Sequence, residues 1–103
     1  MEITVSRPSA EEVVFQPKGE LILPECNPTR AQVVKALEEG ARQITFDLAE
    51  VTFIDSAGLG LLIGLRQTVR QRGGEFLLAG VNSQVLPLFQ MTRLNKIFGL
   101  PDG

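Results

Sequence analysis

The chain has 103 residues, enough for one domain but too few for two independent hydrophobic cores. Hydrophobic residues make up 44% and charged residues 21%, a globular composition that argues against intrinsic disorder. With no His and a single Cys, the chain lacks the residues for a Ser-His-Asp triad, an imidazole zinc site, a thiolate cluster or an internal disulfide. We therefore expect one domain over residues 1–103, with no metal.

The net charge of −2 conceals an uneven distribution. Residues 1–55 carry five basic and ten acidic side chains, whereas residues 56–103 carry five basic and two acidic ones. A pI near 5.1 argues against general nucleic-acid binding. The first residues lack a basic, apolar leader pattern, and the longest run of apolar or glycine residues, Ala57 to Leu65, is far shorter than the ~20 residues of a membrane span. We expect a soluble cytoplasmic protein without membrane insertion, and the lone cysteine fits a reducing compartment.

The first third of the chain is rich in strand-forming residues. Ile3 to Val5 predicts a short edge strand, and Glu12 to Gln16 predicts a second strand. Pro17-Lys18-Gly19 is typical of a turn, after which Glu20 to Leu23 is again extended. These segments predict a hairpin or two closely following strands.

Asn27-Pro28 predicts the start of a helix, because Asn is a favoured N-cap and Pro is tolerated at the first helical position. An apolar stripe follows at helical spacing, formed by Val33, Leu37 and Ala41. Gln43 to Leu48 alternates as a half-buried strand does, and Val51 to Ile54 is a second short extended stretch.

A long helix is predicted from the segment around Ser56 to Arg72. Its packing face consists of Leu59, Leu62, Leu65 and Val69. Leu61 falls off this face, and we expect it to be exposed as part of a contact patch. Gly60 and Gly64, one turn apart, predict a smooth strip that admits the sheet closely, with a partner helix as the alternative.

The last third predicts a strand over Phe76 to Ala79 and a final helix capped by Asn82 or Ser83. The side chains expected to face inward from that helix are those of Val85, Leu86, Phe89 and Met91. Ile97 to Leu100 is expected to close the sheet. Strands that alternate with helices indicate an α/β fold with helices covering the sheet.

Asp55-Ser56-Ala57-Gly58 is the most informative segment, since Ser56 lies where an apolar strand gives way to a helix. On spacing alone we favour a structural role, in which the Ser56 hydroxyl caps the helix. The functional alternative is phosphorylation: a phosphoryl group there adds a charge of about −1.5 to −2 beside free backbone N–H groups.

Catalytic alternatives fit the same segment poorly. Ile54 stands where a nucleophile elbow needs Gly, and no histidine is present to act as the base. Ile63 breaks a G-x-G-x-x-G pattern, and no G-K-[ST] sequence follows. We predict that the chain is not an enzyme.

The run from Phe53 to Gly60 resembles the signature of STAS domains, specifically of bacterial anti-sigma factor antagonists. Gly19-Glu20-Leu21 is similar to an early G-E-L element of that family, and Gly73-Gly74-Glu75 and Val85 to Leu94 are similar to later segments. The resemblance covers about Val13 to Phe98. It departs at Ile22, where the family commonly has Asp.

The resemblance implies a mixed sheet of four or five strands with helices mainly on one face. It also implies a binding switch without a cofactor of its own: unphosphorylated on Ser56, it sequesters an anti-sigma factor, itself an ATP-dependent serine kinase, and frees a sigma factor. A PP2C-type phosphatase reverses the phosphorylation. The partner-binding residues implied are Glu20 and the run Asp55, Ser56, Ala57, Gly58, Leu59, Gly60 and Leu61.

STAS-like domains also serve as non-catalytic subunits of membrane transport complexes, including lipid transporters. In this alternative, the chain docks on the ATPase of an ABC-type complex, and the serine turn is a structural docking point.

Overall fold

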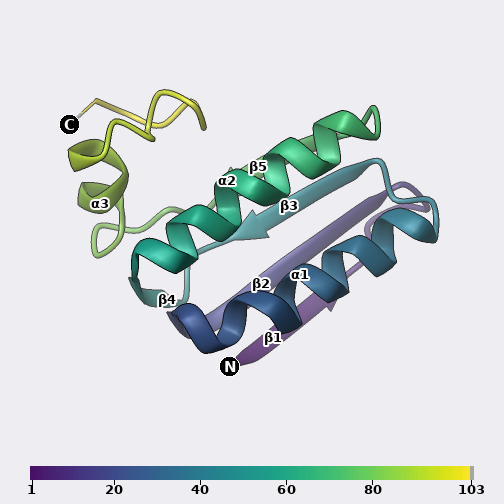
Figure 1. Ribbon diagram of the computed structural model, residues 1–103, viewed down its shortest axis with the longest axis horizontal. Coiled ribbons are helices and arrows are strands. Elements are labelled where there is room, and N and C mark those ends of the chain that lie inside the picture. Colours follow the sequence, from purple (N-terminus) through teal and green to yellow (C-terminus); the bar gives the residue numbers. More distant parts are fainter. Residues whose placement is uncertain (103) are drawn as a thin grey trace.

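In the computed structural model, which describes residues 1–102, two long helices lie across one face of a five-stranded mixed sheet (Figure 1). This arrangement confirms the predicted α/β architecture. The elements in chain order are β1 (Glu2–Ser6), β2 (Glu12–Leu21), α1 (Leu23–Glu38), β3 (Gln43–Asp47), β4 (Val51–Ile54), α2 (Ser56–Gln71), β5 (Glu75–Ala79) and α3 (Leu86–Met91).

The strand order of the sheet is β1-β2-β3-β5, with β4 paired to β2 beside the end of β3. β1 runs antiparallel to β2, as expected of the N-terminal edge strand, and the other pairings are parallel. Alternate residues of β2 and β3 point toward the helices and are buried, among them Val13, Phe15, Ile44 and Phe46. The sheet therefore holds the apolar core on one face only.

β2 is one continuous strand, so the predicted hairpin around Pro17-Lys18-Gly19 is wrong. Its first half pairs with β3, and its last residues pair with β4 after an irregularity between Gly19 and Glu20. Gly19 absorbs this shift with a positive φ of 101°, and its N–H donates to the Glu50 carbonyl at 3.0 Å. The turn-like residues mark the point where β2 changes neighbours.

α1 begins at Leu23, four residues before the predicted start at Asn27. Pro24 lies in the first turn, where its missing N–H costs nothing, and the Glu25 N–H closes the turn on the Ile22 carbonyl at 2.8 Å. Pro28 lies inside the helix as a result. Asn27 accepts from the Arg30 guanidinium at 2.6 Å and caps no backbone group of the described chain.

α2 buries a wider arc than its sequence pattern predicts. Leu59, Leu62, Leu65 and Val69 face inward as expected, but Leu61 is only 1% exposed, so the expectation that it is exposed is wrong. The reason is that α2 packs against α1 on one side and against β4 and β5 beneath.

The glycines of α2 also differ from expectation. A Cβ at Gly60 or Gly64 would meet no atom within 4 Å, so these two residues do not bring the sheet close. The close approach is at Gly58, where a Cβ would overlap the Leu21 carbonyl oxygen of β2. Gly58 is therefore the glycine that lets α2 start against the end of the sheet.

The C-terminal segment packs without adding a strand. The Asn82 side chain accepts from the backbone N–H groups of Gln84 and Val85 and donates to carbonyls at the β3–β4 connection. These bonds fix the chain segment that leads into α3. The helix starts later than predicted, at Leu86. Of the side chains expected to face inward, Val85 and Phe89 are buried, Leu86 is half-buried and Met91 is 80% exposed.

The expected closing strand from Ile97 to Leu100 is also wrong, because these residues form turns. The ring of Phe98 lies 6.2 Å from Phe76 and 5.9 Å from Phe89, measured between ring centroids. Aromatic packing against the core, rather than strand pairing, holds this segment.

Candidate functional site

The turn between β4 and α2 lies beside the start of α1, and Asp55 joins the two helix ends. Its Oδ1 accepts from the Gly58 N–H at 2.8 Å, which makes Asp55 the N-cap of α2. Its Oδ2 accepts from the Leu23 N–H, the first residue of α1, at 3.1 Å. One carboxylate therefore accepts from one N-terminal N–H group of each of two helices and carries its negative charge where both dipoles favour it.

Ser56 is not the N-cap, so its predicted capping role is wrong. It is the first residue of α2, its side chain is exposed, and its hydroxyl makes no hydrogen bond within residues 1–102. Because Asp55 serves as the cap, the Ser56 oxygen points to solvent without a structural role.

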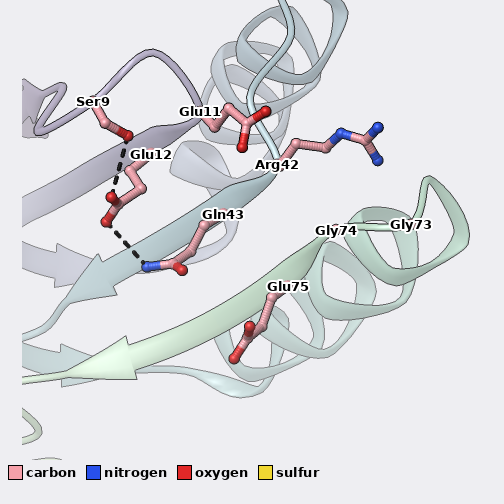
Figure 2. Close-up of a pocket in the computed structure, with 8 residues that line it drawn as sticks. All are labelled: Ser9, Glu11, Glu12, Arg42, Gln43, Gly73, Gly74 and Glu75. Carbon is pink, nitrogen blue, oxygen red and sulfur yellow. Dashed lines mark hydrogen bonds between the residues drawn. The ribbon is translucent and has the colours of Figure 1, made fainter.

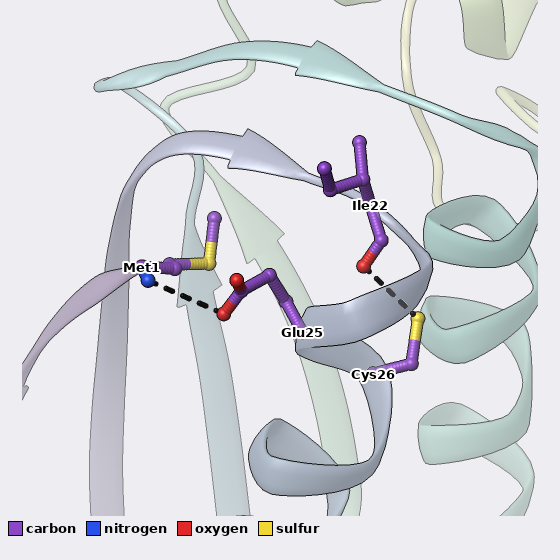
Figure 3. Close-up of polar contacts among 4 residues, drawn as sticks. All are labelled: Met1, Ile22, Glu25 and Cys26. Carbon is purple, nitrogen blue, oxygen red and sulfur yellow. Dashed lines mark hydrogen bonds and ion pairs between the residues drawn. The ribbon is translucent and has the colours of Figure 1, made fainter.

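The start of α1 depends on the acceptor that Asp55 supplies, and Figure 3 shows the other polar contacts at this helix end. Ile22, which stands where the family commonly has Asp, is the N-cap of α1 and offers no side-chain acceptor. Its carbonyl accepts from the Cys26 thiol at 3.6 Å, and the Glu25 carboxylate lies 3.3 Å from the Met1 amino group. Asp55 supplies the side-chain acceptor that Ile22 lacks.

Cys26 lies buried at the same junction, with 5% of its surface exposed. Burial raises the pKa of its thiol above the ordinary value of 9.0, and the Asp55 carboxylate raises it further. The thiol therefore stays protonated near neutral pH, and Cys26 contributes an uncharged side chain to the packing beneath the two helix ends.

Two large apolar side chains in the elements that meet at this turn are exposed: Leu23 of α1 by 67% and Phe53 of β4 by 47%. Glu20, one of the predicted partner-binding residues, lies opposite Phe53 in the β2–β4 register and is also exposed. Sequence patterns do not indicate Leu23 or Phe53 as surface residues, because both stand in apolar runs typical of buried strands. Only the register of β4 and the early start of α1 bring them to this surface.

The structure divides the predicted partner-binding set into two layers. Glu20, Ser56 and Gly60 are exposed, and Asp55 and Ala57 are half-buried. The remaining three, Gly58, Leu59 and Leu61, are buried and support the turn from beneath. We call the exposed and half-buried group, together with Leu23 and Phe53, the Ser56 surface.

A second polar region lies at the opposite end of the sheet, where β2, β3 and β5 begin (Figure 2). Its hollow has a volume of about 400 Å³ and is lined by Ser9, Glu11, Glu12, Arg42, Gln43, Gly73, Gly74 and Glu75. Glu12 accepts from the Ser9 hydroxyl at 3.1 Å and from the Gln43 amide at 3.4 Å. Residues 1–102 contain no group of three or more Asp, Glu, Cys or His side chains arranged to hold a metal ion.

The STAS domain family model matches residues 3–102. The chain belongs to the STAS domain family. Among curated relatives, it is 39% identical over 54 residues to an anti-sigma-B factor antagonist of Listeria monocytogenes, covering 52% of this chain and 47% of the relative. It is 32% identical over 66 residues to an anti-sigma-B factor antagonist of Staphylococcus aureus, covering 64% and 61%. The chain thus spans about half to three fifths of the length of these relatives.

Solved structures show the same fold. A putative anti-sigma factor antagonist from Thermotoga maritima superposes with a TM-score of 0.81 at 25% identity, covering 92% of this chain and 81% of that one. The anti-sigma factor antagonist SpoIIAA in its unphosphorylated form superposes with a TM-score of 0.78 at 20% identity, covering 97% and 99%. A sulfate transporter family protein from Wolinella succinogenes, at 17% identity and a TM-score of 0.77, covering 91% and 76%, shares the fold alone.

No helix within residues 1–102 combines the length and the apolar character needed to cross a bilayer.

Proposed function

We propose that this chain is an anti-sigma factor antagonist, a non-catalytic binding switch controlled by phosphorylation of Ser56. The proposal rests on the different roles of two neighbouring residues, Asp55 and Ser56, in the β4–α2 turn. Asp55 caps the helix, so the exposed Ser56 hydroxyl is available to a kinase. The similarity to relatives that are named anti-sigma-B factor antagonists supports the same function.

The start of α2 suits a phosphoryl group on Ser56. In the described chain, the N–H groups of Ser56 and Ala57 have no backbone or side-chain acceptor. Such groups at a helix N-terminus favour an anion. The folded domain therefore tolerates the modification, which adds a charge of about −1.5 to −2.

The same charge opposes binding of a partner. Leu23 and Phe53 give the Ser56 surface apolar area, and apolar contact in an interface requires that the polar groups beside it be paired or solvated. A phosphoryl group next to the Asp55 carboxylate places two like-charged groups in one turn. A partner that covers the unmodified turn must then desolvate both, and binding weakens without a change of fold.

The partner proposed is an anti-sigma factor that is also an ATP-dependent serine kinase, with a PP2C-type phosphatase restoring the unmodified form. Sequestration of the anti-sigma factor frees its sigma factor. In this scheme the nucleotide is the kinase's cofactor, and the chain acts in the cytoplasm as substrate and ligand.

The proposal is tested by recovering the kinase that co-purifies with the chain, incubating the two with ATP and mapping the modified residue by mass spectrometry. We expect one phosphate, on Ser56, and none on Ser56→Ala. Ser83→Ala is the matched control, because Ser83 is an exposed serine outside the Ser56 surface and its removal should leave modification unchanged. Modification of another residue would contradict the proposal, as would co-purification with an ABC-type ATPase and membrane proteins in place of a kinase.

A further inference from the structure

β5 is the open edge of the sheet. It pairs with β3 in parallel, and no strand of the described residues lies on its other side. The Glu75 N–H donates to the Arg42 carbonyl and the Ala79 carbonyl accepts from Leu48, so the backbone groups of alternate residues 75, 77 and 79 point toward β3. By the alternation of a parallel strand, the N–H and C=O groups of Phe76 and Leu78 point to the open side, where residues 1–102 supply no backbone partner.

A groove of about 480 Å³ runs along this edge. It is lined by Gly74 to Leu78 of the strand and its approach, by Arg66 and Arg70 of α2, and by the turn from Ile97 to Gly99. Consecutive residues of one strand therefore line the groove, as a site for an added strand requires.

The side chains of the groove define what fits there. Leu77 is 37% exposed and Ile97 is 43% exposed, which provides apolar contact. The ion pairs within residues 1–102 are Met1–Glu25 and Arg7–Glu39, so neither Arg66 nor Arg70 has an acidic partner. The charged residues of the groove are these two arginines and one acid, Glu75, so its net charge is positive. Both arginines lie on the same face of α2, since they are four residues apart.

We propose that the β5 edge groove binds an extended acidic segment of a partner protein by strand addition. Backbone hydrogen bonds to Phe76 and Leu78 would give the segment its register, and its carboxylates would reach Arg66 and Arg70. The chemistry required of the partner is alternation of acidic and apolar residues, without proline at the bonded positions.

This groove is separate from the Ser56 surface. Arg66 follows Ser56 by ten residues of α2, a distance of about 15 Å along the helix axis. Occupation of the groove therefore leaves the Ser56 turn uncovered, and the inference does not depend on phosphorylation of Ser56.

The test is a titration of the ¹⁵N-labelled chain with a capped heptapeptide that has alternating Glu and Val at its centre, followed by amide hydrogen exchange. We expect exchange of the Phe76 and Leu78 amides to slow on binding, while the Leu77 amide, which points toward β3, changes little. Because exposed ion pairs contribute about 0.2–1 kcal/mol each and charge reversal adds repulsion, Arg66→Glu with Arg70→Glu should weaken binding about tenfold.

Arg72→Glu is the matched control, since Arg72 is an exposed arginine that does not line the groove, and it should leave the affinity within about twofold. Equal binding of a peptide with Lys in place of Glu would overturn the charge requirement. Binding without slower exchange at Phe76 and Leu78 would overturn strand addition. Protection of the same two amides in the free chain on raising its concentration would show that a second copy occupies the edge, which would also overturn the proposal.

Discussion

The two ends of the parallel strands differ in how far their polar side chains bond one another and in how much apolar surface they expose. At the end where α1 and α2 begin, a single carboxylate accepts from one backbone N–H group of each helix. The next residue, Ser56, has a hydroxyl without a hydrogen bond in the described chain, and Leu23 and Phe53 are exposed at the same end. At the end where β2, β3 and β5 begin, Glu12 bonds Ser9 and Gln43 beside a hollow of about 400 Å³. This hollow thus lies in a region where polar side chains already bond one another. The Ser56 surface, with apolar area and an unengaged hydroxyl, is the better candidate for contact with a protein.

The largest expected difference in stability is between alanine substitutions at two glycines of α2, Gly58 and Gly60. Gly58→Ala should destabilise the domain by about 3 kcal/mol, because the added Cβ overlaps the Leu21 carbonyl oxygen, a backbone atom that cannot move away cheaply. Gly60→Ala, two residues along the same helix, should stabilise it by up to about 1 kcal/mol, since that Cβ meets nothing within 4 Å. Urea denaturation of both variants measures the difference. Equal effects would show that α2 does not start against β2 as described.

Asp55→Ala should lower the free energy of unfolding by about 2 kcal/mol, because it removes the cap of α2 and the acceptor of the Leu23 N–H together. Glu12→Ala, at the other end of the sheet, removes two hydrogen bonds in a partly exposed setting and should cost less than about 1 kcal/mol. Urea denaturation again compares the two. A larger loss of unfolding free energy for Glu12→Ala than for Asp55→Ala would contradict this account. It would show that the end of the sheet at Glu12 depends more on its carboxylate than the end at Asp55 does.

Leu23→Ser with Phe53→Ser should leave stability within about 1 kcal/mol, since both side chains are largely exposed, but should weaken binding of the anti-sigma partner about tenfold. Met91→Ser is the matched control, because Met91 is 80% exposed on α3, which contributes no residue to the Ser56 surface. Isothermal titration with the co-purified partner measures both. Equal binding by the double variant and the unmodified chain would remove Leu23 and Phe53 from the interface.

Much of the fold was predictable from the sequence where local pattern and tertiary packing agree. The strands over β1, β3 and β5 and the inward face of α2 follow from apolar periodicity. The start of α1 was not predictable, because the acceptor for the Leu23 N–H is Asp55, which lies 32 residues away. The continuity of β2 was hidden for a similar reason: Pro17 and Gly19 are typical turn residues, and only the change of neighbour from β3 to β4 places them in a strand.

The sequence singles out the turn that forms the candidate site, but it does not indicate how the roles of Asp55 and Ser56 are divided there. Asp55 and Ser56 were both singled out, but adjacent capping residues compete for one helix end, and sequence spacing does not decide between them. In the structure, Asp55 is the cap, because its second carboxylate oxygen also accepts from the first residue of α1. Leu61 was expected at the surface because helical spacing gives no indication that α1 and the sheet enclose α2 from two sides.

The most direct test of the proposed switch is the affinity of the anti-sigma partner for the chain with and without phosphate on Ser56, measured by titration at one ionic strength. The proposed switch predicts that phosphorylation weakens binding at least about tenfold, equivalent to 1.4 kcal/mol, while the circular dichroism spectrum stays the same. Equal affinity of the two forms would contradict control through the Ser56 surface.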